Sequence, residues 1–402
     1  KSLQLETIPF LAQLSDFQLN GRLDGQLNAS VDKTIVEKFS TDIELTNGSL
    51  THRLQSGDQR TMKFRTITLK GEEVEDRLQL DMKLNDAYEG MLQATVSLPA
   101  NLQQLQKPDA KVTGRLNADL PQLESFNVFL QQAFLPAGKV LADIRLDGSL
   151  QAPRLSGEAA LQVPVIELGE PATVFNKSRV ELKLDGTDIS LQGQSELAGR
   201  PIHLHGSGRF SSIDDWHAGF TVQADGIPLA SIPAISLQDD FALEGNLETK
   251  IDVAIDSQLK IERLDAKLAV GKVTLKRTFI DGEKERLVIS DLRLAAHIEK
   301  DQLLVSGLLK DNKNGRLDMK LMLPAQLDRL SETDLVLDGQ LSADFPNLQA
   351  FGIFLDDVSL PEGRFLAAIS VSGSATAPEL KGNASLDVPR LDLTEPVISF
   401  DN

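Results

Sequence analysis

Two histidines, His203 and His205, are the first candidates for chemistry because a single residue separates them. Side chains two positions apart in a β-strand point to the same side, so both imidazoles could bind one metal ion. The neighbouring Ile202 and Leu204 support a simpler interpretation, in which the histidines lie on the polar side of an ordinary strand. We therefore expect no metal site at this position.

Paired carboxylates are the second candidates, at Asp214-Asp215 and Asp356-Asp357. Adjacent carboxyl groups can act as general acid and base, but both pairs fall where turns or helix ends are expected and water would solvate them. Gly138-Lys139 and Gly271-Lys272 are each followed by Val, which is not the pattern of a phosphate-binding loop. The chain has no Cys, so thiolate chemistry is excluded. We expect no enzymatic activity and no cofactor.

The overall charge narrows the possible partners. Asp and Glu number 59 against 41 Lys and Arg among 402 residues, a net charge of −18. Nucleic-acid binding and attraction to anionic lipid surfaces both need clustered positive charge, so we expect neither. Aromatic residues make up 5% of the chain, too few for the aromatic girdles of an outer-membrane barrel.

The chain is organised around an internal duplication. Residues 114–171 return as residues 339–396 at an offset of 225 without a gap, and 28 of the 58 aligned positions are identical. The repeated positions are mainly Gly, Pro and aliphatic residues, so a surface rather than an active site is duplicated. We expect one β-repeat unit at 1–224 and a second, truncated unit at 225–402 within one continuous sheet. The chain begins at Lys1 and both ends fall within a repeat, which indicates a segment of a longer protein.

Most of each unit alternates between apolar and polar residues. A period of two is typical of strands with one apolar face, and about twenty such strands are expected. The apolar members are the candidate lining residues of that face: Leu78, Leu80, Met82, Leu84, Leu92, Ala94, Val96, Leu98, Val140, Ala142, Ile144, Leu146, Val180, Leu182, Ile251, Val253, Ile255, Phe365, Ala367, Ile369 and Val371. Leu141 and Leu366 fall on the opposite face unless a bulge swaps the sides.

Two segments break the alternation. Apolar residues at helical spacing predict short amphipathic helices over 121–134 and 346–358. Their apolar faces would meet the sheet, either as a permanent plug or as a gate, through Phe126, Phe129, Leu130, Phe351, Phe354 and Leu355.

An apolar face on so many strands must be covered by something. The sheet could pack on itself as a sandwich, wind into a β-helix or close as a barrel. It could also curl into an open trough that holds a hydrocarbon chain. Moving a sixteen-carbon acyl chain from such a trough into water costs on the order of 13 kcal/mol, so its lining would have to be continuous.

The repeated motif also carries a resemblance. Its members are Phe126, Leu135-Pro136, Gly138, Leu141, Gly148-Ser149, Ala152-Pro153, Leu155 and Gly157, and they occur twice in this order. This pattern resembles the bacterial TamB family within the AsmA-like group, and Ile213-Asp214-Asp215-Trp216 adds weaker support. The resemblance implies a long, taco-shaped β-sheet. Together with the two short helices predicted above, we expect an all-β fold whose curled sheet has an apolar concave groove.

The resemblance also implies a function. It implies a periplasmic conduit that carries phospholipids between the inner and outer membranes, with the acyl chains in the groove. The alternative is an envelope scaffold that assists outer-membrane protein assembly. The implied partners are the inner membrane, through an N-terminal anchor, and the outer-membrane assembly barrel TamA, both engaged by parts outside this sequence.

Overall fold

The computed structural model describes most of the chain. The described residues are 3–4, 17–54, 57–101, 103–107, 109–130, 133–149, 151–169, 172–212, 215–233, 241–258, 260–279, 284–300, 302–324, 336–355, 358–359, 362–374, 376–393 and 398–401. The Asp356-Asp357 pair and Asp214 lie outside them. The chain divides into unit 1, formed by Lys1–Glu196 and Leu204–Ala218, and unit 2, formed by Leu197–His203 and Gly219–Asn402.

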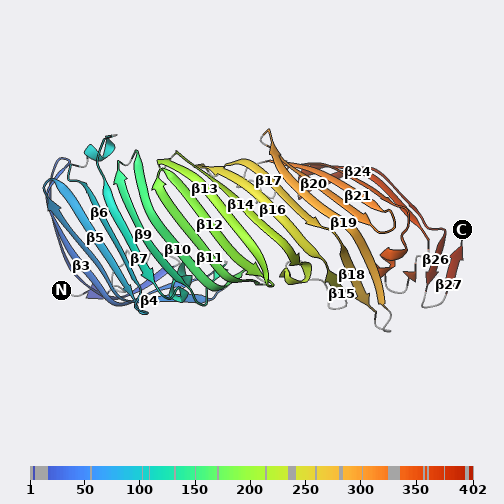
Figure 1. The fold of residues 1–402 in the computed structure, drawn as a ribbon, viewed down its shortest axis with the longest axis horizontal. Helices are drawn as coiled ribbons and strands as arrows, with labels where there is room; N and C mark the ends of the chain where they lie inside the picture. Colours follow the sequence, from blue (N-terminus) through green and yellow to red (C-terminus); the bar gives the residue numbers. More distant parts are fainter. Residues whose placement is uncertain are drawn as a thin grey trace. The chain divides into compact units, whose positions relative to one another are not determined.

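The described residues of unit 1 form antiparallel strands and two 3-10 helices, and Figure 1 shows its strands side by side. Strands β12 (Asp188–Leu197), β13 (Arg200–Ser212) and β14 (Asp215–Pro228) contain residues of both units. The other elements are β1 (Leu3–Gln4), β2 (Phe17–Asp32), β3 (Ile35–Arg53), β4 (Gln59–Val74), β5 (Arg77–Asp86), β6 (Met91–Pro99), η3 (Gln104–Gln106), β7 (Thr113–Leu120), η4 (Glu124–Phe129), β8 (Ala133–Phe134), β9 (Lys139–Gly148), β10 (Pro153–Leu168) and β11 (Thr173–Gly186).

Unit 2 has the same character. Its elements are η5 (Leu229–Ser231), β15 (Phe241–Glu244), β16 (Asn246–Asp256), β17 (Ile261–Val270), β18 (Val273–Thr278), β19 (Lys284–Glu299), β20 (Gln302–Asp311), β21 (Arg316–Pro324), β22 (Val336–Phe345), η8 (Gln349–Phe354), β23 (Val358–Ser359), β24 (Arg364–Ser374), β25 (Pro378–Asp387), β26 (Arg390–Leu393) and β27 (Ile398–Asp401).

In unit 1 each strand pairs with the next along the chain, except that β7 pairs with β9 across the segment that carries η4 and β8. In unit 2 the order is β16, β17, β19, β20, β21, β22, β24 and β25. The first half of β19 pairs with β18, and β18 pairs in turn with β15. All these pairings are antiparallel. The prediction of an all-β fold of amphipathic strands is confirmed.

The duplication is visible in the element boundaries. At the offset of 225, β4 corresponds to β19, β5 to β20, β6 to β21, η4 to η8 and β8 to β23. The turns after β5 and β20 are built alike. Asp86 Oδ1 accepts the backbone N–H groups of Tyr88 and Gly90 at 2.7 and 2.6 Å, and Asp311 Oδ1 accepts those of Lys313 and Gly315 at 2.7 and 2.6 Å.

The two predicted amphipathic helices are wrong in kind and length. Only the 3-10 helices η4 and η8, each of six residues, lie in the described parts of 121–134 and 346–358. In η4 the side chain of Asn127 exchanges two hydrogen bonds with the backbone of Leu135, at 2.7 and 2.8 Å. In η8 the counterpart of Asn127 is Gly352, and η8 has the same six residues, so these bonds join η4 to the segment after β8 but do not set its length.

Candidate functional site

The predicted lining residues of unit 1 share one face of the sheet. Neighbouring strands place these side chains opposite one another without a shift from β5 to β11. Three rows follow from the register between β3 and β11: Ile43, Leu69, Met82, Ala94, Leu116, Ile144, Gly157 and Leu184; Leu45, Ile67, Leu84, Leu92, Ala118, Ala142, Ala159 and Leu182; Thr41, Gly71, Leu80, Val96, Gly114, Leu146, Leu155 and Gly186. No row contains a charged residue. Leu78 and Leu98 pair on this face, and so do Val140 of β9 and Leu161, which in turn pairs with Val180.

Unit 2 has three comparable rows. From β17 to β25 they are Leu268, Leu294, Gly307, Met319, Leu341, Ile369 and Gly382; Val270, Leu292, Leu309, Leu317, Ala343, Ala367 and Ala384; Ala266, Ala296, Val305, Leu321, Gly339, Val371 and Leu380. Ile251 and Val253 of β16 pair with Ala266 and Leu264, and a bulge follows between Ala254 and Ile255. Phe365 pairs with Phe345 at the end of β24 next to η8. We call these six rows the apolar face.

The apolar face is neither packed like a core nor fully exposed. Among the predicted lining residues only Ala367 is buried and only Met82 is exposed, and all the others are half-buried. Leu141 and Leu366 lie on the opposite, polar face and are 46% and 37% exposed. Leu141 is on β9 and Leu366 is on β24, and neither strand shows a register shift, so each stays on the side opposite Ile144 or Ile369. A sandwich core would bury these aliphatic side chains, and most of the predicted lining residues are only half-buried. Nine other members of the rows are buried: Thr41, Leu45, Gly71, Ala118, Leu184, Ala266, Val270, Gly339 and Ala343.

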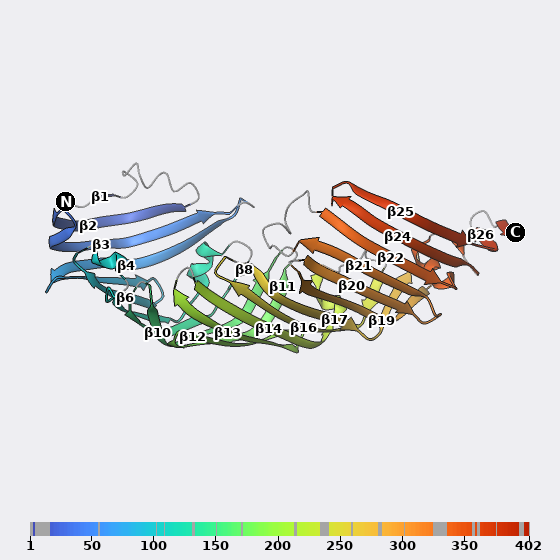
Figure 2. The same cartoon turned by 90° about the horizontal axis from the view of Figure 1, so that it is seen from above.

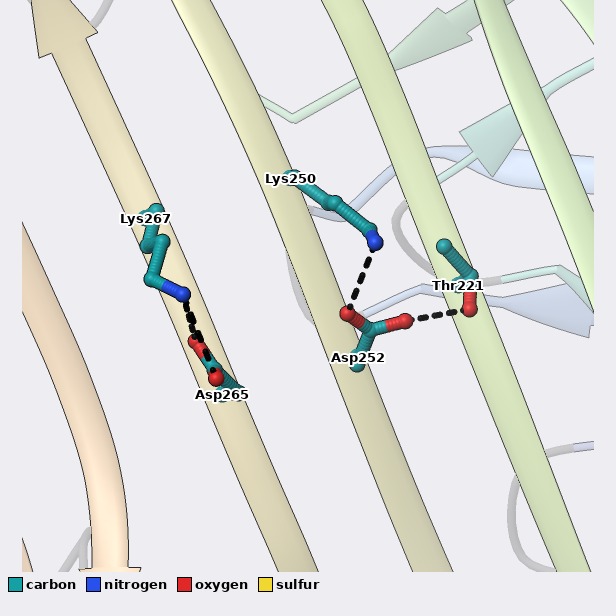
Figure 3. Close-up of polar contacts among 5 residues, drawn as sticks. All are labelled: Thr221, Lys250, Asp252, Asp265 and Lys267. Carbon is teal, nitrogen blue, oxygen red and sulfur yellow. Dashed lines mark hydrogen bonds and ion pairs between the residues drawn. The ribbon is translucent and has the colours of Figure 1, made fainter.

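The opposite face is polar, and its charges are balanced locally. Figure 3 shows Lys250 and Asp252 on β16 beside Thr221 on β14, with Asp265 and Lys267 on β17. The hydrogen bond from Thr221 Oγ1 to Asp252, 2.5 Å long, lowers the pKa of Asp252 below its ordinary 3.8, although partial burial acts in the other direction. On unit 1, Arg115 and Asp143 form two hydrogen bonds at 3.0 and 2.8 Å.

A hollow of about 960 Å³ in unit 1 is lined by residues of both faces. Six of them belong to the row that runs from Thr41 to Gly186, and the charged ones include Lys70, Asp81, Arg115 and Arg145.

The apolar face of unit 1 curls around η4. Phe126 packs against Ala118, Leu120, Leu123 and Val163 of the β7–β10 side. In Figure 2 the short coil of η4 lies close to the label β8, inside the curl of the unit 1 sheet. Val128, in the middle of η4, has no exposed surface, whereas Phe129 is 56% exposed and Leu130 is half-buried.

The far side of this curl holds η4 through polar groups. His52 Nδ1 on β3 lies 2.9 Å from the carbonyl oxygen of Val128, and the His52 ring stacks on Phe17 of β2 with centroids 4.2 Å apart. Arg60 of β4 donates to the carbonyl oxygens of Leu130 and Ala133 at 2.6 and 2.8 Å. These contacts join β2, β3 and β4 to the segment between β7 and β9.

Unit 2 repeats this arrangement with different side chains. Arg277 of β18, the counterpart of His52, donates to the carbonyl oxygen of Ile353 at 3.1 Å and lies over the Phe241 ring at 5.0 Å. Ile353, the counterpart of Val128, is also fully buried, against Leu275 and Leu287. Phe351 packs against Phe345 and Leu348, while Phe354 is 52% exposed and Leu355 36% exposed.

Sequence reasoning missed the anchors of η4 and η8. Helical spacing directed attention to the Phe residues, although a 3-10 helix turns the neighbouring Val128 and Ile353 inward. The partners His52 and Arg277 lie 76 residues from the carbonyls that they meet. Their equal offset of 225 was the one signal that could have identified them as a pair.

The other residues considered for chemistry form no cluster in the described part of the chain. His203 and His205 are exposed on β13, and the described part of the chain holds no group of three or more His, Cys, Asp or Glu placed to bind a metal. Within the same residues, no helix has the length and hydropathy needed to cross a membrane.

Comparison with known proteins adds the family. No solved structure matches the chain. The family model described as "TamB, N-terminal domain" matches residues 2–161 and 217–386, which fall on the two copies of the duplication. Because these matches cover most of the sequence, the chain belongs to the TamB family.

Proposed function

We propose that the apolar face holds the acyl chains of phospholipids, and that the chain is a periplasmic segment of a conduit between the inner and outer membranes. The observation that carries the proposal is the set of uncharged, mostly half-buried rows, which cross eight strands between β3 and β11. Acyl chains need an apolar surface without interruption and little else, because each methylene exposed to water costs about 0.8 kcal/mol.

The mechanism is passive. Half-buried Leu, Ile, Val and Ala side chains give the acyl chains surroundings similar to a bilayer interior, while headgroups remain at the open side in water. Movement along the rows then exchanges one set of aliphatic contacts for an equivalent one, so no large barrier separates successive positions. We propose further that the rows of the two units serve one path, as a single repeated sheet would provide. In this proposal an N-terminal anchor and the barrel TamA act at the ends, beyond this sequence.

Photo-crosslinking tests the proposal directly. A photoreactive amino acid at Leu80, Val96, Ile144 or Phe365 should form adducts with phospholipid in the full-length protein. The same probe at Lys83, Gln93 or Arg145, whose side chains point to the polar face, should not. Equal adduct yields on both faces, or none on the apolar face, would refute the conduit.

The scaffold alternative would use a free sheet edge to bind nascent strands. The exposed strand in unit 2 is β25, which in the described residues pairs with β24 alone. Its counterpart β10 pairs on one side with β9 and on the other with β11. The edge position of β25 in unit 2 is thus an interior position in unit 1, and we favour the conduit.

A further inference from the structure

The segment that carries η4 joins two parts of the sheet that are far apart in strand order. Along the ladder β5 and β6 separate β4 from β7, yet η4, which follows β7, contacts β3 and β4. The backbone of η4 and of the residues after it accepts hydrogen bonds from Arg60, and the Val128 carbonyl meets His52. We call η4 and η8 braces, since each crosses the curl of its own sheet.

The two braces keep the same geometry although their polar partners differ. The carbonyl oxygens of Val128 and Ile353 meet His52 and Arg277, and all four positions are related by the offset of 225. Phe17 and Phe241 lie beside these partners, and their rings are 6.5 and 6.3 Å from Phe129 and Phe354. Both units therefore keep a 3-10 segment whose backbone is bound by a side chain from a distant strand, with a Phe ring beside that contact.

Those rings are unusually exposed for their position. Phe129 and Phe354 are 56% and 52% exposed, although each directly follows a fully buried residue. Each also lies 6.4 Å, centroid to centroid, from the ring of the partly buried Phe126 or Phe351. Each brace therefore presents a half-exposed phenyl ring beside two other Phe rings. An apolar guest would cover this ring, which water leaves unfavourably exposed.

We propose that Phe129 and Phe354 are the residues that acyl chains contact where they pass the braces, replacing the aliphatic lining there. The inference rests on the proposed conduit function. An acyl chain that follows the apolar rows meets the brace, because the brace connects the two sides of the curved sheet. The acyl chain must therefore pass beside the brace. The exposed phenyl ring supplies apolar contact at that step, and the buried Val128 or Ile353 keeps the brace in place.

The test is photo-crosslinking in the full-length protein, with a benzophenone amino acid placed at one position at a time. The tested positions are Phe129 and Phe354, and the matched controls are Leu141 and Leu366, which are also exposed apolar residues but lie on the polar face. Ile144 and Ile369 report whether lipid occupies the apolar rows at all. We expect phospholipid adducts at Phe129, Phe354, Ile144 and Ile369, at least tenfold above those at Leu141 and Leu366.

Two other outcomes separate the inference from the function on which it rests. Adducts at Ile144 and Ile369 without adducts at Phe129 and Phe354 would overturn the role of the braces and leave the conduit standing. Absence of adducts from Ile144 and Ile369 would overturn the conduit itself.

A second measurement uses serine variants. The double variant Phe129→Ser and Phe354→Ser should stay folded, with a melting temperature lowered by a few degrees because about half of each ring is buried. It should lower the phospholipid recovered per chain at least twofold. Unchanged recovery, equal to that of the double variant Leu141→Ser and Leu366→Ser, would contradict the proposal.

Discussion

A single carboxylate in the middle of an apolar row should weaken lipid binding without unfolding the protein. Ile144→Asp places the charge on β9, in the row that runs from Ile43 to Leu184. The matched control is Leu141→Asp on the same strand, where the side chain is 46% exposed on the polar face. Both variants exchange a branched aliphatic side chain for the same acid, so the two differ in the face that receives the charge.

The magnitude follows from the strand spacing. An acyl chain that lies along a row crosses a strand about every 4.8 Å, which corresponds to roughly four methylenes per strand. If the hydrated carboxylate displaces those four, the loss is about 3 kcal/mol, at about 0.8 kcal/mol for each methylene. Such a loss weakens binding at this position roughly a hundredfold. Ile144 is half-buried, so the lost burial costs the fold only about 1 kcal/mol.

The assay measures phospholipid recovered per mole of purified full-length protein, with circular dichroism during heating as the control for folding. We expect Ile144→Asp to carry less lipid than Leu141→Asp, because the carboxylate displaces acyl chains at β9 and leaves the rest of the apolar face unchanged. We expect unchanged lipid in Leu141→Asp and similar melting in both variants. Equal lipid content in the two folded variants would refute the reasoning. Unfolding of Ile144→Asp alone would show that the face is a packed core.

Three further predictions concern the fold. Val128→Ala removes two methyl groups from a fully buried site and should destabilise the brace by about 2 kcal/mol. The measurement is amide hydrogen exchange, which should become faster in η4. Unchanged exchange would show that Val128 is not the anchor. Asp86→Ala loses two charge-assisted backbone bonds, worth roughly 1.5–3 kcal/mol each before relaxation, whereas Asp86→Asn keeps an acceptor and should melt at a temperature closer to that of the unmodified protein. The pKa of Asp252 is lowered in the folded protein, so its contribution to stability is complete above the unfolded value of 3.8 and is lost as the pH falls through the folded pKa. Thr221→Val should raise the pKa of Asp252 in an NMR titration and shift acid unfolding to higher pH, and an unchanged titration would rule out the hydroxyl as the cause.

The fold class could be predicted because its signal is local. The alternation in β9 assigned Ile144 and Leu141 to opposite faces, and the register with β7 and β10 carries Ile144 across to Leu116 and Gly157. A period of two is written into the sequence wherever one face avoids water. The same rule would mislead across β3, where Asn47 has a φ of 49° and the pairing with β2 shifts by one residue.

The candidate site was predictable only in part, because the braces depend on contacts between distant segments. Phe126 and Phe129 have the spacing of an α-helix, but the chain forms a 3-10 turn of six residues here and again in η8. The resulting 3-10 geometry buries Val128 and leaves Phe129 exposed. Nothing in the local sequence indicates that His52 would meet the Val128 carbonyl.

The differences between the two braces show what the repeat preserves. His52 and Arg277 differ in size, charge and number of donors, yet both contact the backbone carbonyl at the middle of a brace and both lie beside a Phe of the neighbouring strand. A backbone carbonyl accepts either donor, so the contact survives an exchange of side chains that a catalytic or metal site would not tolerate. The rows show the same tolerance, since Met82 corresponds to Gly307 and Ala94 to Met319. What is repeated is therefore the position of an apolar surface and of the backbone that crosses it, which is the requirement of a guest recognised by its apolar surface alone.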